Sequence, residues 1–176
     1  MGGVAGALIA IHDALLAQVA LLGDALRARG WRLATAESCT GGLLAGTCTA
    51  PAGASDWFAA GFVTYANDAK TGLLGVPDAL IARHGAVSAE VADAMARGAL
   101  AHARVPLALS VTGIAGPGGG SAAKPVGTVW MGLAWTTASG VESRTERLNL
   151  DGDRAAIRER TVAAALQRLL DVARAA

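Results

Sequence analysis

The chain has 176 residues, of which 53% are hydrophobic, and its mean hydropathy is +0.42. This length and composition predict a single domain over residues 1–176 with a real hydrophobic core, and they exclude a disordered chain. No apolar run approaches the ~20 residues that a membrane-spanning helix needs, so we expect no membrane partner. Fifteen basic and 14 acidic residues leave a net charge of +1, which argues against a nucleic-acid partner.

The first third of the chain predicts alternating helices and strands. Residues 1–10 are an apolar arm without the basic start of a signal peptide. Apolar residues then recur at helical spacing, at Leu15, Val19, Leu22 and Leu26, and Gly30 is placed to end this helix. A strand, a helix and a second strand are expected over residues 31–37, 41–49 and 57–65.

The remainder predicts a short helix carrying Lys70 and a longer helix capped by Ser88. A buried strand over 107–112 is followed by a glycine-rich segment, 113–127, that cannot be regular structure. Two strands, 128–136 and 141–150, form a hairpin, and Asp151 or Asp153 caps a last helix. This alternation predicts an α/β domain with helices on both faces of a mixed sheet of about five strands.

The cysteines and histidines predict neither a disulfide nor a metal site. Cys39 and Cys48 flank a predicted helix that rises ~13 Å over nine residues, whereas a disulfide needs Cα atoms within about 7 Å of each other. His12, His84 and His102 lack the spacing of metal ligands. With no export signal, the cytoplasm is the expected compartment.

Lysine is rare in this chain. Thirteen of the 15 basic residues are arginine, and only Lys70 and Lys124 are lysine. A desolvated lysine can lose its proton and act as a base, whereas an arginine stays charged. The two lysines therefore mark either positions where arginine would not serve or the result of biased codon usage.

Three turn-rich, polar segments follow predicted strands: residues 37–42, 65–70 and 112–127. In open α/β sheets, ligands bind in the crevice at the carboxyl ends of the strands. We therefore expect the three segments to form one site. The long segment 112–127 supports this, because a loop of that length in a compact domain is usually functional, and its prolines argue against a flexible linker.

Each candidate residue in these segments has a second interpretation. Ser38, on a sharp turn before a helix, suits a nucleophile beside N–H groups that bind an anion, but Ser38 or Thr40 equally suits a helix cap. A serine with Tyr65 and Lys70 is typical of hydrolases in which an amine or phenolate takes the hydroxyl proton, but both residues also suit a solvated surface. Arg154 offers a fork of donors to a phosphate, or is a surface arginine at a helix start.

Together, these motifs resemble the CinA C-terminal domain family in order and register. The matching motifs lie at residues 36–42, 65–70, 85–88, 112–119 and 124–127. The resemblance covers most of the chain from Trp31 onward. It implies a three-layer α/β/α domain and an amidohydrolase that converts nicotinamide mononucleotide to nicotinic acid mononucleotide and ammonia without a cofactor.

The resemblance also implies the roles of individual residues. The reactive serine of the family falls on Ser38, its tyrosine on Tyr65 and its lysine on Lys70. Ser38 would attack the carboxamide carbon while a neutral Lys70 takes the proton, directly or through Tyr65. The residues expected to bind the substrate, by its oxyanion or its ribose phosphate, are Cys39, Thr40, Gly41, Gly42, Thr112, Gly113 and Arg154.

Two alternatives stay open. Cys39 is intrinsically the better nucleophile, although no motif offers it a histidine partner. The chain could also be a non-catalytic module that binds nucleotides or a competence- or DNA-damage-related partner, because the same phosphate-binding loops would serve it. A homo-oligomer is compatible with the sequence, since Trp130 and Trp135 suit either a core or an interface.

Overall fold

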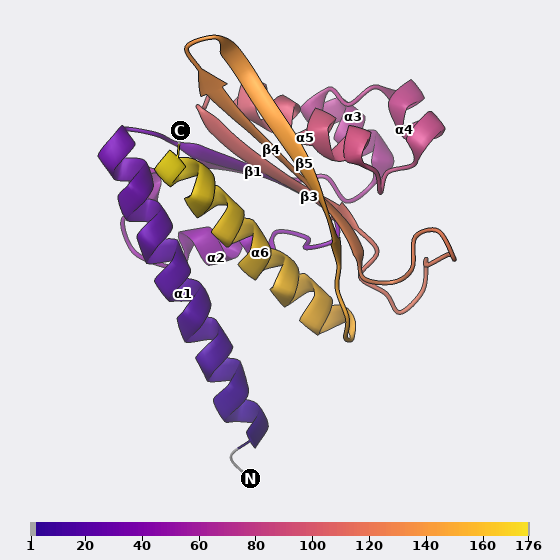
Figure 1. Cartoon of the computed structure of the whole chain (residues 1–176), viewed down its shortest axis with the longest axis horizontal. Coiled ribbons are helices and arrows are strands. Elements are labelled where there is room, and N and C mark those ends of the chain that lie inside the picture. The colour runs from indigo at the N-terminus through magenta and orange to yellow at the C-terminus, as the bar shows by residue number, and fades with distance from the viewer. Residues whose placement is uncertain (1–2, 176) are drawn as a thin grey trace.

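A computed structural model describes the backbone of residues 3–175, and side chains are described from Asp13 onward. Helix α1 leads into an alternation of strands and helices that ends in a hairpin and helix α6 (Figure 1). The elements are α1 (Gly3–Arg29), β1 (Leu33–Glu37), α2 (Leu43–Thr49), the 3-10 helix η1 (Ala54–Asp56), β2 (Phe58–Val63), α3 (Asn67–Leu74), α4 (Asp78–His84), α5 (Ala89–Ala103), β3 (Leu107–Gly113), β4 (Thr128–Thr137), β5 (Gly140–Asn149) and α6 (Arg154–Ala175).

The five strands form one mixed sheet in the order β2-β1-β3-β4-β5. Strand β1 runs parallel to β2 and β3, whereas β4 is antiparallel to both β3 and β5. Glu37, at the end of β1, pairs with Val63 on one side and Val111 on the other. The segments that follow β1, β2 and β3 therefore start at the same edge of the sheet, as predicted.

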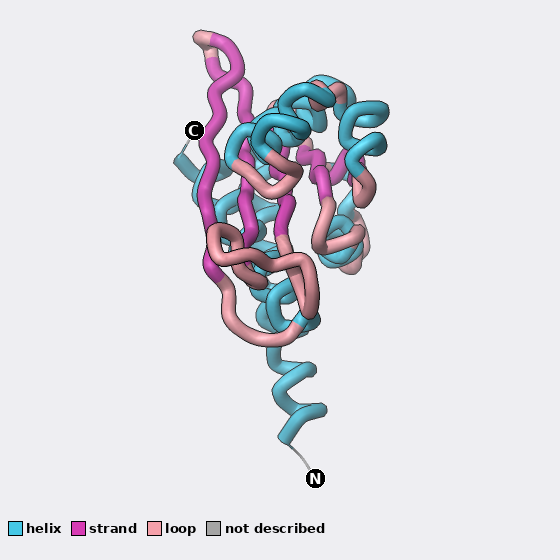
Figure 2. Tube along the Cα trace, turned by 90° about the vertical axis from the view of Figure 1, so that its right-hand side faces the viewer, coloured by secondary structure: helices cyan, strands magenta, loops and turns pink. Residues whose placement is uncertain are grey.

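Helices cover both faces of the sheet (Figure 1). Helices α1, α2 and α6 lie on one face, and α3, α4 and α5 lie on the other. The predicted three-layer α/β/α fold with a mixed sheet is therefore confirmed. The long loop between β3 and β4 extends beyond the strand ends in both views (Figures 1 and 2).

The two faces of the sheet bury side chains of different size. Large residues of the strands, such as Leu109 and Met131, pack under α1 and α6. Small residues face α5, where a Cβ added at Gly132 would lie 2.3 Å from the carbonyl oxygen of Ala92. The hydroxyl of Ser110 donates to the same carbonyl at 2.6 Å. Because of this close approach, α5 lies directly against the strands that lead to the expected site.

Most predicted elements are present, with ends shifted by one to a few residues. The hydroxyl of Ser88 caps α5 by accepting from the N–H of Val91 at 3.3 Å, and Asp153 caps α6 through the N–H of Ala156 at 2.9 Å. Helix α4 was not predicted, because its seven residues are too few to show a helical period. The expected N-terminal arm is helical from Gly3 on. Residues 1, 2 and 176, and the side chain of His12, lie outside the described part.

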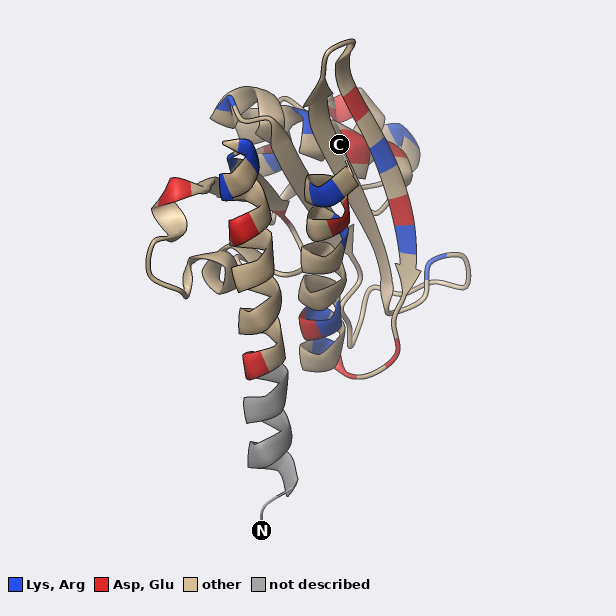
Figure 3. Cartoon of the chain, turned by 60° about the vertical axis from the view of Figure 1, so that its left-hand side comes forward, with Lys and Arg blue, Asp and Glu red and all other residues tan. Residues whose placement is uncertain are grey.

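Charges of both signs alternate along β5 and share the surface of α6 (Figure 3). This mixed surface agrees with the net charge of +1. Within residues 3–175, no helix combines the length and apolar character that crossing a bilayer requires.

Candidate active site

A cavity of about 230 Å³ lies at the edge where β1, β2 and β3 end. Its wall includes residues from all three predicted segments and from the start of α6, among them Ser38, Tyr65, Lys70, Thr112, Gly113 and Arg154. The sheet topology thus brings together residues that are more than 110 positions apart in the sequence.

The side chains of Ser38 and Lys70 meet in this cavity. The Nζ atom of Lys70 lies 3.2 Å from the Oγ atom of Ser38. Ser38 follows β1 and is half-buried, so a ligand in the cavity can reach its hydroxyl. Lys70, on the first turns of α3, is 1% exposed. A lysine this deeply buried does not have the solvated role that the sequence also allowed.

The surroundings of Lys70 favour the uncharged amine. Burial lowers the pKa of Lys70 from its ordinary value of 10.5, because the charged form loses its hydration, and the nearby Cys39 thiol opposes this only partly. Nζ donates to the carbonyl oxygen of Thr64 at 2.8 Å and approaches that of Tyr65 at 3.4 Å. A neutral amine has two N–H groups and one lone pair. When the amine is neutral, its two N–H groups can serve the two carbonyls, and its lone pair is left for the Ser38 hydroxyl.

A buried carboxylate organises the turn that carries Ser38. Glu37 is fully buried, and its side chain accepts hydrogen bonds at 2.7–3.0 Å from four donors: the Thr40 hydroxyl and the backbone N–H groups of Gly42, Leu44 and Ala45. Glu37 therefore caps α2, and the alternative in which Ser38 or Thr40 caps this helix is wrong. The N–H groups at the helix start already have an acceptor, so they are not available to a phosphate, contrary to prediction.

Three of the predicted substrate-binding residues shape the turn and do not line the cavity. Gly41 and Gly42 adopt left-handed backbone angles, with φ of 59° and 93°, that glycine accommodates without strain. The N–H of Gly41 donates to the carbonyl oxygen of Ser38 at 3.1 Å. The carbonyl oxygen of Thr40 accepts from Nη2 of Arg158 at 2.6 Å. Glu37 and Arg158 therefore hold the turn from its two sides.

Two backbone N–H groups remain for a developing oxyanion. The N–H of Ile114 donates to Thr128 in the neighbouring strand at 2.9 Å, so alternation along β3 directs the N–H of Gly113 to the opposite side. On that side β1 has already ended at Glu37. Apart from the sulfur of its own side chain, the N–H of Cys39 also has no acceptor within the described residues. Both Gly113 and Cys39 line the cavity.

Cys39 is a poor nucleophile in this environment. Its side chain is 5% exposed, and burial raises the pKa of the thiol to about 11, with the carboxylate of Glu37 adding to the effect. The reactive form of cysteine is the thiolate, which is scarce at neutral pH when the pKa is this high. Both Cys39 and Cys48 are free and buried.

Tyr65 and Arg154 meet at the mouth of the cavity. Nη2 of Arg154 donates to the Tyr65 hydroxyl at 3.1 Å, and Nη1 donates to the carbonyl oxygen of Gly116 at 2.8 Å. Arg154 is thus exposed but also lines the cavity. Tyr65 is 61% exposed. Its hydroxyl has Arg154 as its partner and makes no hydrogen bond to Ser38 or Lys70 within the described residues, which does not support the predicted relay through Tyr65.

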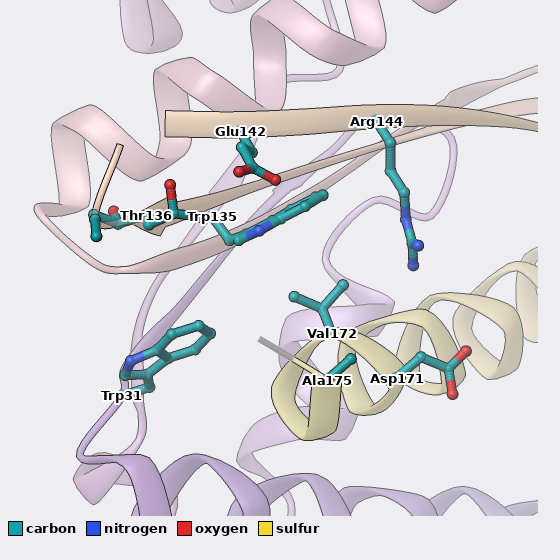
Figure 4. A pocket seen from close by; sticks show the side chains of 10 residues that line it. Trp31, Trp135, Thr136, Glu142, Arg144, Asp171, Val172 and Ala175 are labelled. Atoms are coloured by element: carbon teal, nitrogen blue, oxygen red, sulfur yellow. The ribbon is translucent and has the colours of Figure 1, made fainter. Parts of the chain in front are cut away.

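A larger cavity of about 530 Å³ lies at the opposite end of the sheet (Figure 4). Trp31 and Trp135 face it, together with Val172 and Ala175 of α6. Its lining places no hydroxyl or thiol beside a lysine or histidine, which separates it from the Ser38 site. Trp135 and Trp130 are both half-buried, and an interface role for either stays a prediction. Across the described residues, no group of three His, Cys, Asp or Glu side chains could hold a metal ion.

The fold is a three-layer α/β/α domain, and a serine lies beside a buried lysine at the carboxyl edge of its sheet. The five sequence motifs surround this pair, and together these features define the class of protein to which the chain belongs. The CinA C-terminal domain family matches residues 16–173, and the chain belongs to this family.

Particular relatives are similar over most of their length. The chain is 54% identical over 151 residues to nicotinamide-nucleotide amidohydrolase PncC of Pseudomonas putida, covering 86% of this chain and 92% of the relative. It is 53% identical over 148 residues to the protein of the same name from Escherichia coli strain K12, covering 84% and 88%. The crystal structure of the competence/damage inducible protein CihA from Agrobacterium tumefaciens matches with a TM-score of 0.84 and 42% identity, over 90% of this chain and 94% of that one.

Sequence reasoning missed two organising side chains, those of Glu37 and Arg158. The signal for Glu37 was present, because a carboxylate at the end of an apolar strand and just before a turn must find donors when it is buried. Arg158 gave no such signal, because its partner is a backbone carbonyl 118 residues away.

Proposed function

We propose that this chain hydrolyses the carboxamide of nicotinamide mononucleotide to give nicotinic acid mononucleotide and ammonia, with Ser38 as the nucleophile. The observation that carries the proposal is the 3.2 Å contact between the Ser38 hydroxyl and a buried lysine amine. The names of the relatives that are 53–54% identical over most of this chain support the substrate and the reaction.

In the first half of the reaction, the Oγ atom of Ser38 attacks the carboxamide carbon and its proton passes to the neutral amine of Lys70. With its two N–H groups donated to the carbonyl oxygens of Thr64 and Tyr65, the neutral amine has its lone pair free for the proton of Ser38. The charged lysine then gives this proton to the amide nitrogen as the C–N bond breaks, and ammonia leaves. An ester between Ser38 and the nicotinoyl group remains.

In the second half, water attacks the ester and Lys70 again accepts a proton. The C–O bond to Ser38 breaks, the proton returns to Oγ, and the acid product leaves and gives its remaining proton to solvent. The N–H groups of Gly113 and Cys39 stabilise the oxyanion in both halves. Removing one such donor typically costs about 10²–10³ in rate. These groups suffice for acyl transfer, so the step requires no cofactor.

Arg154 is the residue that we assign to the phosphate of the substrate. It lies at the mouth of the cavity, and its planar fork of donors suits a phosphate. The N-terminus of α2 is closed to this role by Glu37. Because both cysteines are free, we also expect the protein to work in the cytoplasm, where thiols stay reduced.

The direct test is to incubate the purified chain with nicotinamide mononucleotide and to measure ammonia and the acid product. We expect turnover by the wild type and by Cys39→Ala, and none by Ser38→Ala. If Cys39→Ala is inactive and Ser38→Ala is active, the nucleophile is Cys39 and not Ser38. If the wild type binds the nucleotide but releases no ammonia, the chain is instead a non-catalytic nucleotide-binding module.

A further inference from the structure

The short connection between α4 and α5 forms part of the cavity wall, and its backbone is held by side chains. We define the strap as residues 84–87, of which Ala86 and Val87 line the cavity. All four carbonyl oxygens of the strap accept a hydrogen bond from a side chain. The donors are Lys124 to residues 84 and 87 (3.0 and 2.7 Å), Ser88 to residue 85 (2.9 Å) and Thr112 to residue 86 (2.8 Å).

Lys124 makes the longest-range of these contacts. It comes from the glycine-rich loop, 40 and 37 residues from its two partners, and it is half-buried. Its ammonium is a compact charge with three donors, so one atom can serve two carbonyls that lie three residues apart. The planar guanidinium of an arginine does not match this arrangement. This accounts for the second of the two lysines in a chain that otherwise uses arginine.

Two backbone N–H groups of the strap, those of the cavity-lining residues Ala86 and Val87, lack a hydrogen-bond acceptor. Within residues 13–175, the N–H groups of Ala86 and Val87 have no protein acceptor, although both residues are half-buried. Half-buried backbone donors in a cavity wall need an acceptor from water or from a ligand. The four carbonyl groups are held by side chains, and the N–H of Gly85 donates to the carbonyl oxygen of Ile81 at 2.8 Å. The N–H groups of Ala86 and Val87 are therefore the backbone donors that the strap can offer to a ligand.

We propose that the N–H groups of Ala86 and Val87 donate to oxygen atoms of the bound nucleotide, and that Lys124 is the positioning residue that holds them in place. This inference rests on the proposed function for the identity of the ligand, but it concerns binding and not bond breaking. Lys124 should therefore set the affinity for the nucleotide, while Ser38 and Lys70 set the rate of the chemical step.

The first test is steady-state kinetics of Lys124→Met, which keeps the aliphatic chain and removes the donors. We expect KM for nicotinamide mononucleotide to rise about tenfold, the ratio that loss of one modest interaction produces, with kcat within about twofold of wild type. Lys124→Arg should recover only part of the affinity. An unchanged KM in Lys124→Met, or a fall in kcat without a change in KM, would overturn the proposal.

The matched control is Arg147→Met. Arg147 and Lys124 both line another cavity, of about 360 Å³, whose wall also includes Val87 of the strap. Within the described residues, the guanidinium of Arg147 hydrogen-bonds only Asn149 and the carbonyl oxygen of Ala123. We expect this variant to keep the wild-type KM. An equal rise in KM for Arg147→Met would show that loss of positive charge, and not the tie to the strap, weakens binding, and it would overturn the role of Lys124.

A second measurement uses the wild-type protein and therefore does not depend on whether a variant folds. In the wild-type protein, addition of nicotinic acid mononucleotide should shift the amide NMR signals of Ala86 and Val87 and slow their hydrogen exchange. Bound ligand with both amides unaffected would refute the proposal. Product binding with protected amides but no turnover would refute the proposed function alone, so the two failures are distinguishable.

Discussion

The two lysines of this chain both hold backbone carbonyls close to the Ser38 cavity, and their surroundings differ in one way. Both donate to backbone carbonyls of connecting segments: Lys70 to Thr64, and Lys124 to residues 84 and 87. Only Lys70 has a hydroxyl, that of Ser38, as a further partner. In the proposed mechanism, carbonyl contacts alone give Lys124 a structural role, whereas the neighbouring hydroxyl of Ser38 lets the buried Lys70 act as a base.

The largest effect that would test this comparison is the loss of the base. Lys70→Arg keeps a long cation but cannot supply a neutral amine, so we expect kcat to fall by about 10²–10⁴. Steady-state ammonia release measures this, with Lys124→Arg as the matched control that changes affinity and leaves kcat near wild type. Full activity in Lys70→Arg would remove the chemical distinction between the two lysines.

The next effect concerns the turn beside Lys70. Glu37→Gln retains the shape of the side chain, but its amide nitrogen faces backbone N–H groups, which leaves at least one buried donor unpaired. We expect a loss of stability of about 1–3 kcal/mol. We also expect a fall in kcat of about 10²-fold, since Ser38 is no longer held against Lys70. Thermal unfolding and kcat measure the two effects.

The control for this variant is Thr40→Val, which removes one of the four donors to Glu37 and leaves the carboxylate in place. It should cost about 1 kcal/mol of stability and leave most of the activity. A Glu37→Gln enzyme with wild-type kcat would show that the turn orients Ser38 without its carboxylate.

A smaller and graded effect is the dependence of the rate on pH. In the proposed mechanism the base acts in its uncharged form, and burial lowers the pKa of Lys70 below 10.5. We therefore expect kcat/KM to rise with pH by about tenfold per unit and then level off below the range of an ordinary lysine. The Lys124→Met variant should show the same profile at lower affinity. A rate that falls over this pH range would mean that the charged lysine is the active form.

The smallest effect belongs to the Tyr65 hydroxyl. Because this hydroxyl contacts Arg154 and not Ser38, Tyr65→Phe should leave kcat within a few fold, the change expected from an exposed hydrogen bond of about 1 kcal/mol. We expect a larger change in KM than in kcat, since Arg154 loses a hydrogen-bond partner at the mouth of the cavity. A fall in kcat as large as that of Lys70→Arg would restore the relay through Tyr65.

Much of the architecture was accessible from local patterns. The alternation of helices and strands, the hairpin, and the caps at Ser88 and Asp153 all follow from residues close together in the sequence. The convergence of the three segments followed from a general property of parallel strands, whose carboxyl ends share one edge. Helix α4 was missed because seven residues between a proline and a glycine carry too little periodicity.

The differences between the expected and the observed contacts of the site share one physical cause. The free N–H groups at the start of α2 looked available to an anion, but the chain supplies its own anion in Glu37. The Tyr65 hydroxyl looked available to Lys70, but it contacts Arg154, 89 residues further along. In both cases the sequence indicated which residues lie near the site, but it did not indicate their hydrogen-bond partners, because those partners are set by distances in space.

Local patterns in the chain were therefore enough to predict the class of fold, the edge of the sheet that carries the cavity, and the serine and lysine that line it. The contacts between distant residues came from packing alone: Ser38 meets Lys70 across 32 residues, and Lys124 meets the strap 37–40 residues away. The reason is that helical and strand periods act over a few residues, whereas the desolvation that lowers the pKa of Lys70 exists only once the layers have packed around it.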